Sequence, residues 1–410
     1  VFFMFFIMSF VGLPKAGQIF NVAFILAVVA GAGLMTYLAL REDYAGPNSA
    51  EYLAAKEEAH HNKERIVELI QHRSPSDNPG EPNPPNMIPR IGAVTLLRND
   101  PKTQGPKLFD RNCLGCHAHS SLEQELPAQD RHFTAPDLDG FASRDWIAGL
   151  LDPTQIRSPH YFGNTAHKNG RMAEWLDDFV PNASISIDDI KDEDKVARLI
   201  SRLKVSESAG AVKKIDDMVM EVQEAGVRVA TQFGDGQLAA APVFAETNDG
   251  EEPKLEGVLF AFLSPELDDI AAALSAQAEL PYQREIDAQA VKDERVARGL
   301  AKMKTTCANG CHRVGDVGQL GLAPDLTGYG NYEWMMGIVS NPGHRRFYGP
   351  ENDRMPAFGE QQIPSDNEIS MIVDWLRKDY IDESTEFAGK AHTPDEAERA
   401  VEMDLTVDAP

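Results

Sequence analysis

The sequence predicts a mainly α-helical protein with an N-terminal transmembrane helix followed by two copies of one helical module, the first carrying a long insert. Three observations support this prediction. An uncharged apolar stretch lies near the N-terminus. A series of residues recurs in the same order in two distant segments. Apolar residues recur at helical spacing where each copy ends.

The apolar stretch at residues 18–40 contains no charged side chain. As a helix it reaches about 35 Å, enough for a tilted membrane span. Residues 1–11 are also apolar but too few to span, and we interpret them as the end of another membrane helix. A cleaved signal peptide is the alternative for the N-terminus. Residues 1–41 are therefore the expected transmembrane segment.

Residues 42–90 are expected to hold a charged helix and a connector. The helix covers 47–72, with Asn48 or Ser49 as its N-cap. The connector at 74–89 is rich in proline and is expected to be extended. At the other end of the chain, residues 386–410 form an acidic tail.

The globular part repeats itself. Each copy has a glycine eight residues before its first cysteine, then the sequence Ala-Pro-Asp-Leu, a tryptophan eleven residues past that alanine, and later a methionine. The tryptophans are Trp146 and Trp334, and the methionines are Met172 and Met355. So many matches in one order indicate two copies of one module.

The repeat sets the expected domain organisation. Each copy is expected to end in a helix, at 264–277 in the first and 365–378 in the second, because apolar residues there follow helical spacing. The first methionine and its helix are far apart, which indicates an insert. The predicted parts are module 1 at 91–281 with an insert at about 177–262, and module 2 at 282–385. Inside the insert we expect helices near 192–203 and 212–225 and short strands at 227–231 and 243–245.

All four cysteines lie in two short motifs that end in histidine: Cys113, Cys116 and His117 in the first, and Cys307, Cys311 and His312 in the second. The first is the C-x-x-C-H pattern of covalent c-type haem attachment, and the second has one extra residue between its cysteines. Two thiols form thioethers to the haem, and the histidine binds its iron. The sequence therefore predicts two covalently attached haem c groups. Asn309 and Gly310 are expected to absorb the extra residue, since both tolerate φ > 0.

A cysteine pair of this kind has two other interpretations. A zinc half-site needs further ligands of matching type from distant sequence. A redox dithiol normally opens a helix after a strand, and no such pattern surrounds either motif. Haem remains the favoured interpretation because the two motifs occupy equivalent places in the repeat.

Each haem iron needs a second ligand or an open position. We predict Met172 and Met355 as these ligands, because a thioether suits electron transfer; the rivals are His167 for the first and Met335, Met336 or His344 for the second. The carbonyls of Pro136 and Pro324 are expected to accept the N–H of the proximal imidazoles. Trp146 and Trp334 are expected to pack on haem or hydrogen-bond a propionate, with ordinary core residues as the alternative.

The net charge of −25 makes nucleic acid an unsuitable partner. An acidic surface suits a small basic cytochrome, which it would attract electrostatically. A solvated surface that only prevents aggregation is the alternative.

The repeated C-x-x-C-H, A-P-D-L-x-G, tryptophan, methionine and closing helix resemble the class I cytochrome c fold, present twice. Residues 92–101 and 105–109, together with the preceding apolar helix, resemble the membrane-anchored di-haem cytochrome c part of bacterial quinol-oxidising cytochrome bc complexes. The resemblance covers most of residues 1–170 and 260–380, and it does not extend to the insert.

This resemblance implies partners and a location. In such a complex the chain accompanies a cytochrome b-type subunit, takes electrons from a Rieske iron–sulfur protein, and passes them to a soluble cytochrome or an oxidase. Because c-type haem is attached outside the cytoplasm, the modules are expected on the periplasmic, positive side of the bacterial inner membrane, with the first segment in contact with lipid. Catalysis by this chain alone is not expected.

Two alternative functions stay open at this point. The chain also has the parts of a di-haem subunit of a cbb-type haem–copper oxidase. A di-haem peroxidase is a third interpretation, although it needs one haem with an open position and acid–base groups above it.

Overall fold

The computed structural model describes residues 15–47, 49–71, 92–123, 133–206, 209–225, 228–233, 236–245, 254–361 and 363–382, with isolated positions at 88, 90, 396 and 399. The chain divides into two compact units, Val1–Leu97 and Arg98–Pro410, and each is described by itself. The apolar segment 1–11 lies outside the described residues, as do nearly all of the connector at 74–89 and nearly all of the tail at 386–410.

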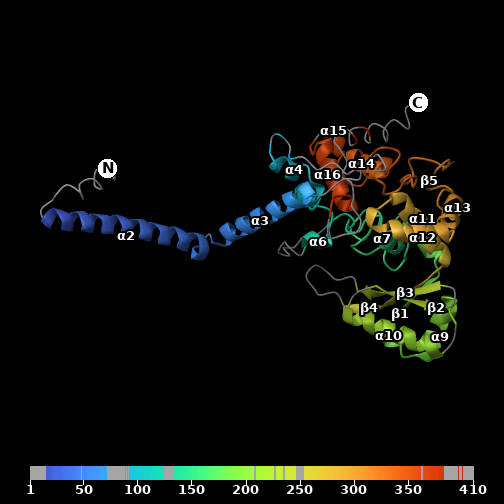
Figure 1. Ribbon diagram of the computed structural model, residues 1–410. Helices are drawn as coiled ribbons and strands as arrows, with labels where there is room; N and C mark the ends of the chain where they lie inside the picture. Colours follow the sequence, from blue (N-terminus) through green and yellow to red (C-terminus); the bar gives the residue numbers. More distant parts are fainter. Residues whose placement is uncertain are drawn as a thin grey trace. The chain divides into compact units, whose positions relative to one another are not determined.

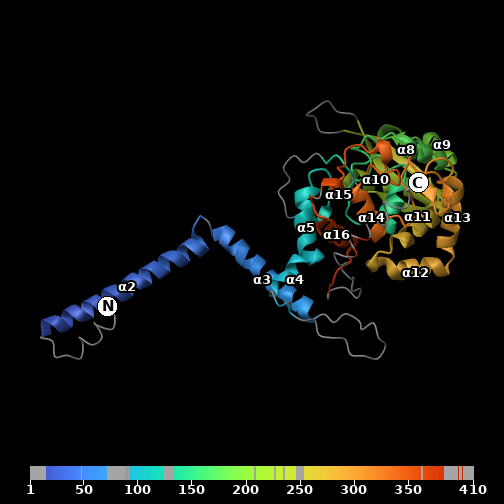
Figure 2. The same ribbon diagram turned by 90° about the horizontal axis from the view of Figure 1, so that it is seen from above.

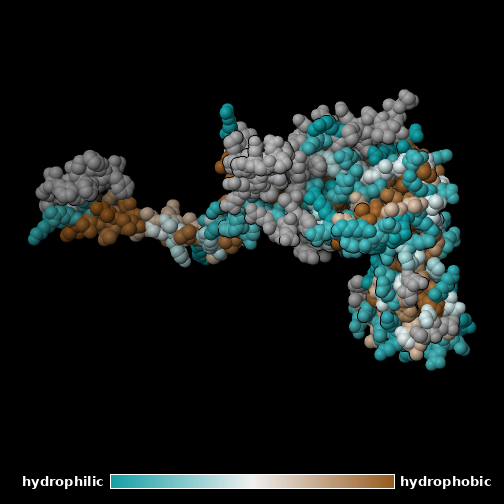
Figure 3. Space-filling view, turned by 45° about the vertical axis from the view of Figure 1, so that its right-hand side comes forward, coloured by the Kyte–Doolittle hydropathy of each residue, from teal (hydrophilic) through white to brown (hydrophobic). Residues whose placement is uncertain are grey.

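The first unit begins with a long apolar helix, α2 (Lys15–Ala45). The helix predicted at 18–40 is therefore confirmed, and it starts earlier and ends later than predicted. Its part Gly17–Ala45 is long and apolar enough to cross a membrane, and its large apolar side chains are exposed (Figure 3). An apolar surface of this extent is unfavourable in water, so α2 is suited to anchor the chain in a membrane.

A polar helix, α3 (Ser49–Gln71), follows as predicted, and the short α4 (Val94–Arg98) lies at the end of the unit. His60 and His61 on α3 are exposed and lie within 4 Å of glutamate side chains on the same helix, with His60 Nδ1 3.4 Å from Glu64 Oε2. Both are side chains on the exposed surface of a polar helix.

The second unit holds the repeats and the insert (Figures 1 and 2). The elements of the first repeat are α5 (Pro101–Asn112), α6 (Ser120–Glu123), α7 (Arg144–Leu150), α8 (Arg171–Phe179) and, after the insert, α11 (Pro265–Ala278). Those of the second are η2 (Pro281–Gln283), α12 (Arg284–Lys292), α13 (Arg295–Thr306), β5 (Arg313–Val314), β6 (Val317–Gly318), α14 (Tyr332–Ser340), η3 (Gly349–Glu351), α15 (Phe358–Gln361) and α16 (Asp366–Arg377).

Local sequence explains where the main helices begin. Asp100 caps α5 by accepting a hydrogen bond from Thr103 N at 3.1 Å, and Pro101 occupies the first turn, where its missing N–H costs nothing. Ser365 and Glu368 form a capping box at the start of α16. Both helices that were predicted to close the modules, α11 and α16, are present at the expected residues.

The two closing helices pack on both repeats. Helix α11 contacts α7 of its own repeat and also α13, the helix before the cysteines of the second repeat. Helix α16 likewise contacts α14 of its own repeat and α5 of the first repeat. Each closing helix thus packs on the helix that precedes the cysteines of the other repeat, so the repeats exchange their closing helices.

A glycine makes each of these exchanged contacts possible. A Cβ on Gly105 in α5 would lie 2.2 Å from the Cβ of Trp375 in α16, and a Cβ on Gly299 in α13 would lie 2.0 Å from the backbone oxygen of Asp269 in α11. The repeated glycine noticed in the sequence therefore marks a close helix crossing in both copies.

One hydrophobic core serves both repeats. It contains side chains from α7, α14 and both closing helices, including Ile147, Met336, Ile270 and Ile372, which are all at most 1% exposed. Arg377 in α16 is also buried and donates hydrogen bonds to the carbonyls of Ala278 and Gly330. The repeats therefore form one packed body within the second unit.

The insert is a small α/β layer. Strands β1 (Asn182–Ser186), β2 (Val229–Phe233), β3 (Gly236–Phe244) and β4 (Leu255–Leu263) form an antiparallel sheet in the order β1-β4-β3-β2. The predicted helices are present as α9 (Glu193–Arg202) and α10 (Ala209–Ala225), with the short η1 (Ile187–Asp189) before them.

The sheet of the insert is buried on both faces. Leu238, Ala240 and Phe260 belong to the core beneath α9 and α10, whereas Ala239 and Ala261 belong to the core of the repeats. Neighbouring residues of a strand point to opposite faces, so β3 and β4 serve two cores at once. Because both faces of β3 and β4 are buried, their sequences are apolar at successive positions and do not alternate. The predicted strands covered only part of β2 and the end of β3, and β1 and β4 were not predicted.

Candidate functional site

Each cysteine motif begins where a helix ends. The first cysteine remains hydrogen-bonded to the last turn, with Cys113 N 2.7 Å from Phe109 O and Cys307 N 2.9 Å from Met303 O. Both thiols are partly buried against the shared core. The helices α5 and α13 therefore present the two motifs in the same way.

The histidines are held by equivalent contacts. His117 Nδ1 lies 2.8 Å from Pro136 O, and His312 Nδ1 lies 2.7 Å from Pro324 O. These are the contacts predicted from the repeated prolines. A carbonyl accepts only, so Nδ1 carries the proton and Nε2 keeps the lone pair with which a histidine binds a metal.

Burial acts on the same imidazoles. It lowers the pKa of His117 and of His312, and it outweighs the proline carbonyls, which raise the pKa. Both rings are therefore neutral at pH 7, which is the state in which an imidazole binds a metal ion.

The extra residue of the second motif is absorbed locally. Gly310 has φ +99°, and a Cβ at this position would meet open space. The backbone of His312 still bonds Cys307 O at 3.0 Å, as His117 bonds Cys113 O at 2.9 Å. The bulge predicted at Asn309 and Gly310 is confirmed for Gly310, which alone of the two takes φ > 0.

None of the four cysteines forms a disulfide. Burial raises the pKa of Cys113 to about 12 and also raises that of Cys307, so both are protonated at pH 7. Within the described part of the chain, no group of three or more His, Cys, Asp or Glu side chains is placed to hold a metal ion.

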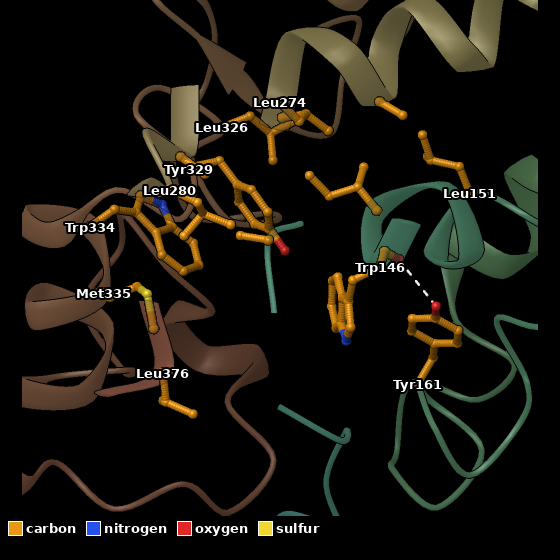
Figure 4. Close-up of a cluster of buried hydrophobic side chains, with 14 of the residues drawn as sticks. Trp146, Leu151, Tyr161, Leu274, Leu280, Leu326, Tyr329, Trp334, Met335 and Leu376 are labelled. Carbon is orange, nitrogen blue, oxygen red and sulfur yellow. Dashed lines mark hydrogen bonds between the residues drawn. The ribbon is translucent and has the colours of Figure 1, made fainter. Parts of the chain in front are cut away.

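Both tryptophans are buried, and Figure 4 shows them within the hydrophobic cluster. Trp146 Nε1 donates to Asp137 O at 3.0 Å, and Trp334 Nε1 donates to Asp325 O at 2.8 Å. Each indole has one N–H, and a backbone carbonyl already accepts it. The predicted roles of both tryptophans toward a haem, packing on it or bonding a propionate, stay predictions.

The aspartates next to the prolines were not singled out from the sequence. Asp137 pairs with His160 at 3.1 Å, and Asp325 lies 3.7 Å from Arg346. Their backbone N–H groups bond the carbonyls of the same two partners. Both aspartates belong to the repeated Ala-Pro-Asp-Leu segment, so the repetition itself was the signal that could have revealed them.

The predicted methionine ligands lie in a different part of the repeats. Met172 is partly buried in the first turn of α8, and Met355 is partly buried between η3 and α15. The loops before them contact each other: Ala166 N donates to Asp353 Oδ2 at 3.2 Å, and the rings of His167 and Tyr348 stack at 5.6 Å. Iron ligation by the two methionines stays a prediction.

The rival ligands have other surroundings. Met335 and Met336 in α14 are 5% and 0% exposed within the shared core, and Figure 4 shows Met335 beside Leu376. His344 Nδ1 accepts a hydrogen bond from Arg346 N at 3.3 Å. These two methionines therefore fill the core.

The comparisons with known proteins give one local similarity. A segment of 80 residues is 35% identical to cytochrome c oxidase subunit 2 of Bacillus sp. (strain PS3), a respiratory-chain protein. The match covers 20% of this chain and spans 17% of the length of that protein. No protein-family profile matches the chain, and no solved structure matches it.

Proposed function

We propose that the chain binds two haem c groups covalently and transfers electrons. The first haem is attached to Cys113 and Cys116, with His117 as an iron ligand. The second is attached to Cys307 and Cys311, with His312. One observation carries the proposal: behind each cysteine pair, a buried imidazole has its Nδ1 fixed by a proline carbonyl.

The donor set fits haem c. Each site has two unpaired thiols and a neutral histidine whose Nε2 is free to bind iron. Met172 and Met355 are proposed as the second iron ligands, which would leave no open position for a substrate. Bound haem iron supplies a one-electron couple. The cysteines and histidines would hold it, and the proline carbonyls would orient the proximal rings.

We place this electron transfer in a membrane-bound respiratory complex. The apolar helix α2 supports an attachment to the membrane, and the local similarity to an oxidase subunit supports a respiratory role. More narrowly, we propose a subunit of a bc-type quinol:cytochrome c oxidoreductase, with a cytochrome b-type subunit as neighbour. It would receive electrons from a Rieske protein and pass them to a soluble cytochrome or an oxidase on the periplasmic side.

The second candidate is a subunit of a haem–copper oxidase, and the local similarity to an oxidase subunit favours it. Purification of the native complex separates the two. Cytochrome b and a Rieske protein in the preparation support the bc-type complex, whereas copper and a haem–copper subunit refute it. Rapid carbon monoxide binding to either ferrous haem would instead support a peroxidase and contradict the methionine ligands.

Mass spectrometry of the denatured protein tests the haem assignment. We expect two covalent haems in the parent chain. The paired variants Cys113→Ala/Cys116→Ala and Cys307→Ala/Cys311→Ala should each retain one. A parent chain without covalent haem would falsify the proposal.

A further inference from the structure

A continuous set of aromatic rings and hydrogen bonds joins the two proximal histidines. We propose that electrons pass between the two haems through this set, with Phe141 at its centre. The inference rests on the proposed function. In the transfer, one ferrous iron is oxidised, the other ferric iron is reduced, and no bond forms or breaks.

The two ends of the connection are identical in kind. His117 bonds Pro136 O, and the next residue, Asp137, accepts the indole N–H of Trp146. In the second repeat, His312 bonds Pro324 O, and Asp325 accepts the N–H of Trp334. Each proximal imidazole is thus linked to a buried indole by two hydrogen bonds and one peptide unit.

Phe141 joins these two ends. Its ring centroid lies 4.8 Å from that of Trp146 and 6.3 Å from that of Trp334, with the latter pair stacked at an interplanar angle of 24°. Tyr329, the residue equivalent to Phe141 in the second repeat, provides a parallel contact at 5.8 Å from Phe141 and 4.8 Å from Trp334. Figure 4 shows the Tyr329 ring between the two indoles in that view.

The backbone beside these rings is built for close approach. Gly330 follows Tyr329, and Ala142 follows Phe141; both take positive φ, +75° and +61°. A Cβ on Gly330 would lie 2.4 Å from the Cβ of Ala142. The missing side chain therefore lets the repeats approach where the rings meet.

Geometry alone makes this route distinct from the other contact between the repeats. The loops before Met172 and Met355 also contact each other, through Asp353 and Tyr348. That second contact lies on the segments of the predicted methionine ligands, whereas the aromatic set begins at the histidines. Electron tunnelling is faster through bonded and closely packed atoms than through gaps, so the aromatic set is the better route from one proximal ring to the other.

The test uses the full-length protein with both haems attached. A short pulse of a fast reductant delivers less than one electron per molecule. Exchange between the haems is then the phase of the absorbance change whose rate constant does not depend on protein concentration. Phe141→Leu removes the ring shared by three ring contacts and should slow this exchange several-fold. Phe179→Leu, a partly buried phenylalanine stacked on Trp175 outside the set, should leave it unchanged.

Two further measurements keep the result interpretable. The haem mass and both reduction potentials should be the same in parent and variants, because neither phenylalanine is a proposed ligand. If Phe141→Leu does not fold, Trp146→Phe is the second variant. It keeps one aromatic ring, loses the pyrrole ring of the indole together with the N–H bonded to Asp137 O, and should also slow the exchange. Unchanged exchange in a variant that retains both haems overturns the inference and leaves the proposed function intact. Absence of the haems overturns both.

Discussion

The two repeats keep the same backbone contacts at their candidate sites while their side chains differ nearby. Both fix a histidine with a proline carbonyl and an indole with an aspartate carbonyl. They differ in cysteine spacing and in the partner of the aspartate, which is His160 in one and Arg346 in the other. Backbone carbonyls thus preserve the geometry, and side chains outside it are free to change.

A further difference lies where the insert meets the first repeat. Asp152 is fully buried, and Arg228 from the insert lies 2.9 Å from it. The equivalent residue of the second repeat, which has no insert, is the buried Ser340. At this position the first repeat has a buried carboxylate, and the insert supplies the cation beside it.

The largest expected effect comes from breaking this pair. Arg228→Met leaves the Asp152 carboxylate without its cation. Burial already raises the pKa of Asp152, because a buried charge is unfavourable, and Arg228 is the main group that opposes this. We expect a loss of about 3 kcal/mol in the free energy of unfolding, measured by urea denaturation. Adding Asp152→Ser, which copies the second repeat, should recover most of the loss. No recovery in the double variant would show that the pair is not the cause.

Replacing the glycine at the helix crossing should have the same effect in both repeats. Gly105→Ala and Gly299→Ala each place a Cβ within 2.2 Å of a packed atom, so each should destabilise the protein by about 2 kcal/mol through overpacking. Gly343→Ala, where a Cβ would meet its nearest atom at 3.5 Å, is the control. A clear difference between the first two would show that the exchanged contacts are unequal.

The cysteine loops should respond differently to the same substitution. Gly310→Ala forces a side chain into positive φ and should cost about 1 kcal/mol. Gly115→Ala in the first motif meets open space at an ordinary φ and should not destabilise. Thermal unfolding of the two variants measures the difference. Equal effects would mean that the extra residue is absorbed elsewhere.

The smallest expected effect concerns acid. Burial raises the pKa of Asp137, but the hydrogen bonds from His160 and Asp139 N together lower it by more. The pKa of Asp137 is therefore below its ordinary value. Its contribution to stability is therefore present above the unfolded pKa and lost as the pH falls through the folded one. Carboxylates titrate roughly between pH 6 and pH 3. Over this range the free energy of unfolding of Asp137→Asn should fall less than that of the parent. Asp188→Asn, at an exposed carboxylate, should follow the parent.

Local patterns predicted the local structure well. The spacing of apolar residues predicted α16, and the repeated prolines predicted the contacts of both histidines. The four-stranded sheet was mostly missed because β3 is rich in alanine and β4 is apolar on both faces. Such strands lack the alternation by which a half-buried strand is recognised.

The exchange of closing helices could not be predicted for a different reason. Gly105 and Gly299 occupy equivalent places, and α11 and α16 carry apolar residues at the same spacing. Either helix therefore suits either glycine as far as local sequence shows. The choice depends on the shared core, in which both closing helices also pack on α7 or α14.

The exchanged helices have a consequence for biosynthesis. Helix α5 is made early, but its partner α16 is among the last helices of the described chain to leave the ribosome. A chain interrupted before α16 would expose the apolar face of α5 beside the first cysteine pair, and such exposed surface favours aggregation and proteolysis. Incomplete chains are therefore expected to be removed rather than to persist with one working centre.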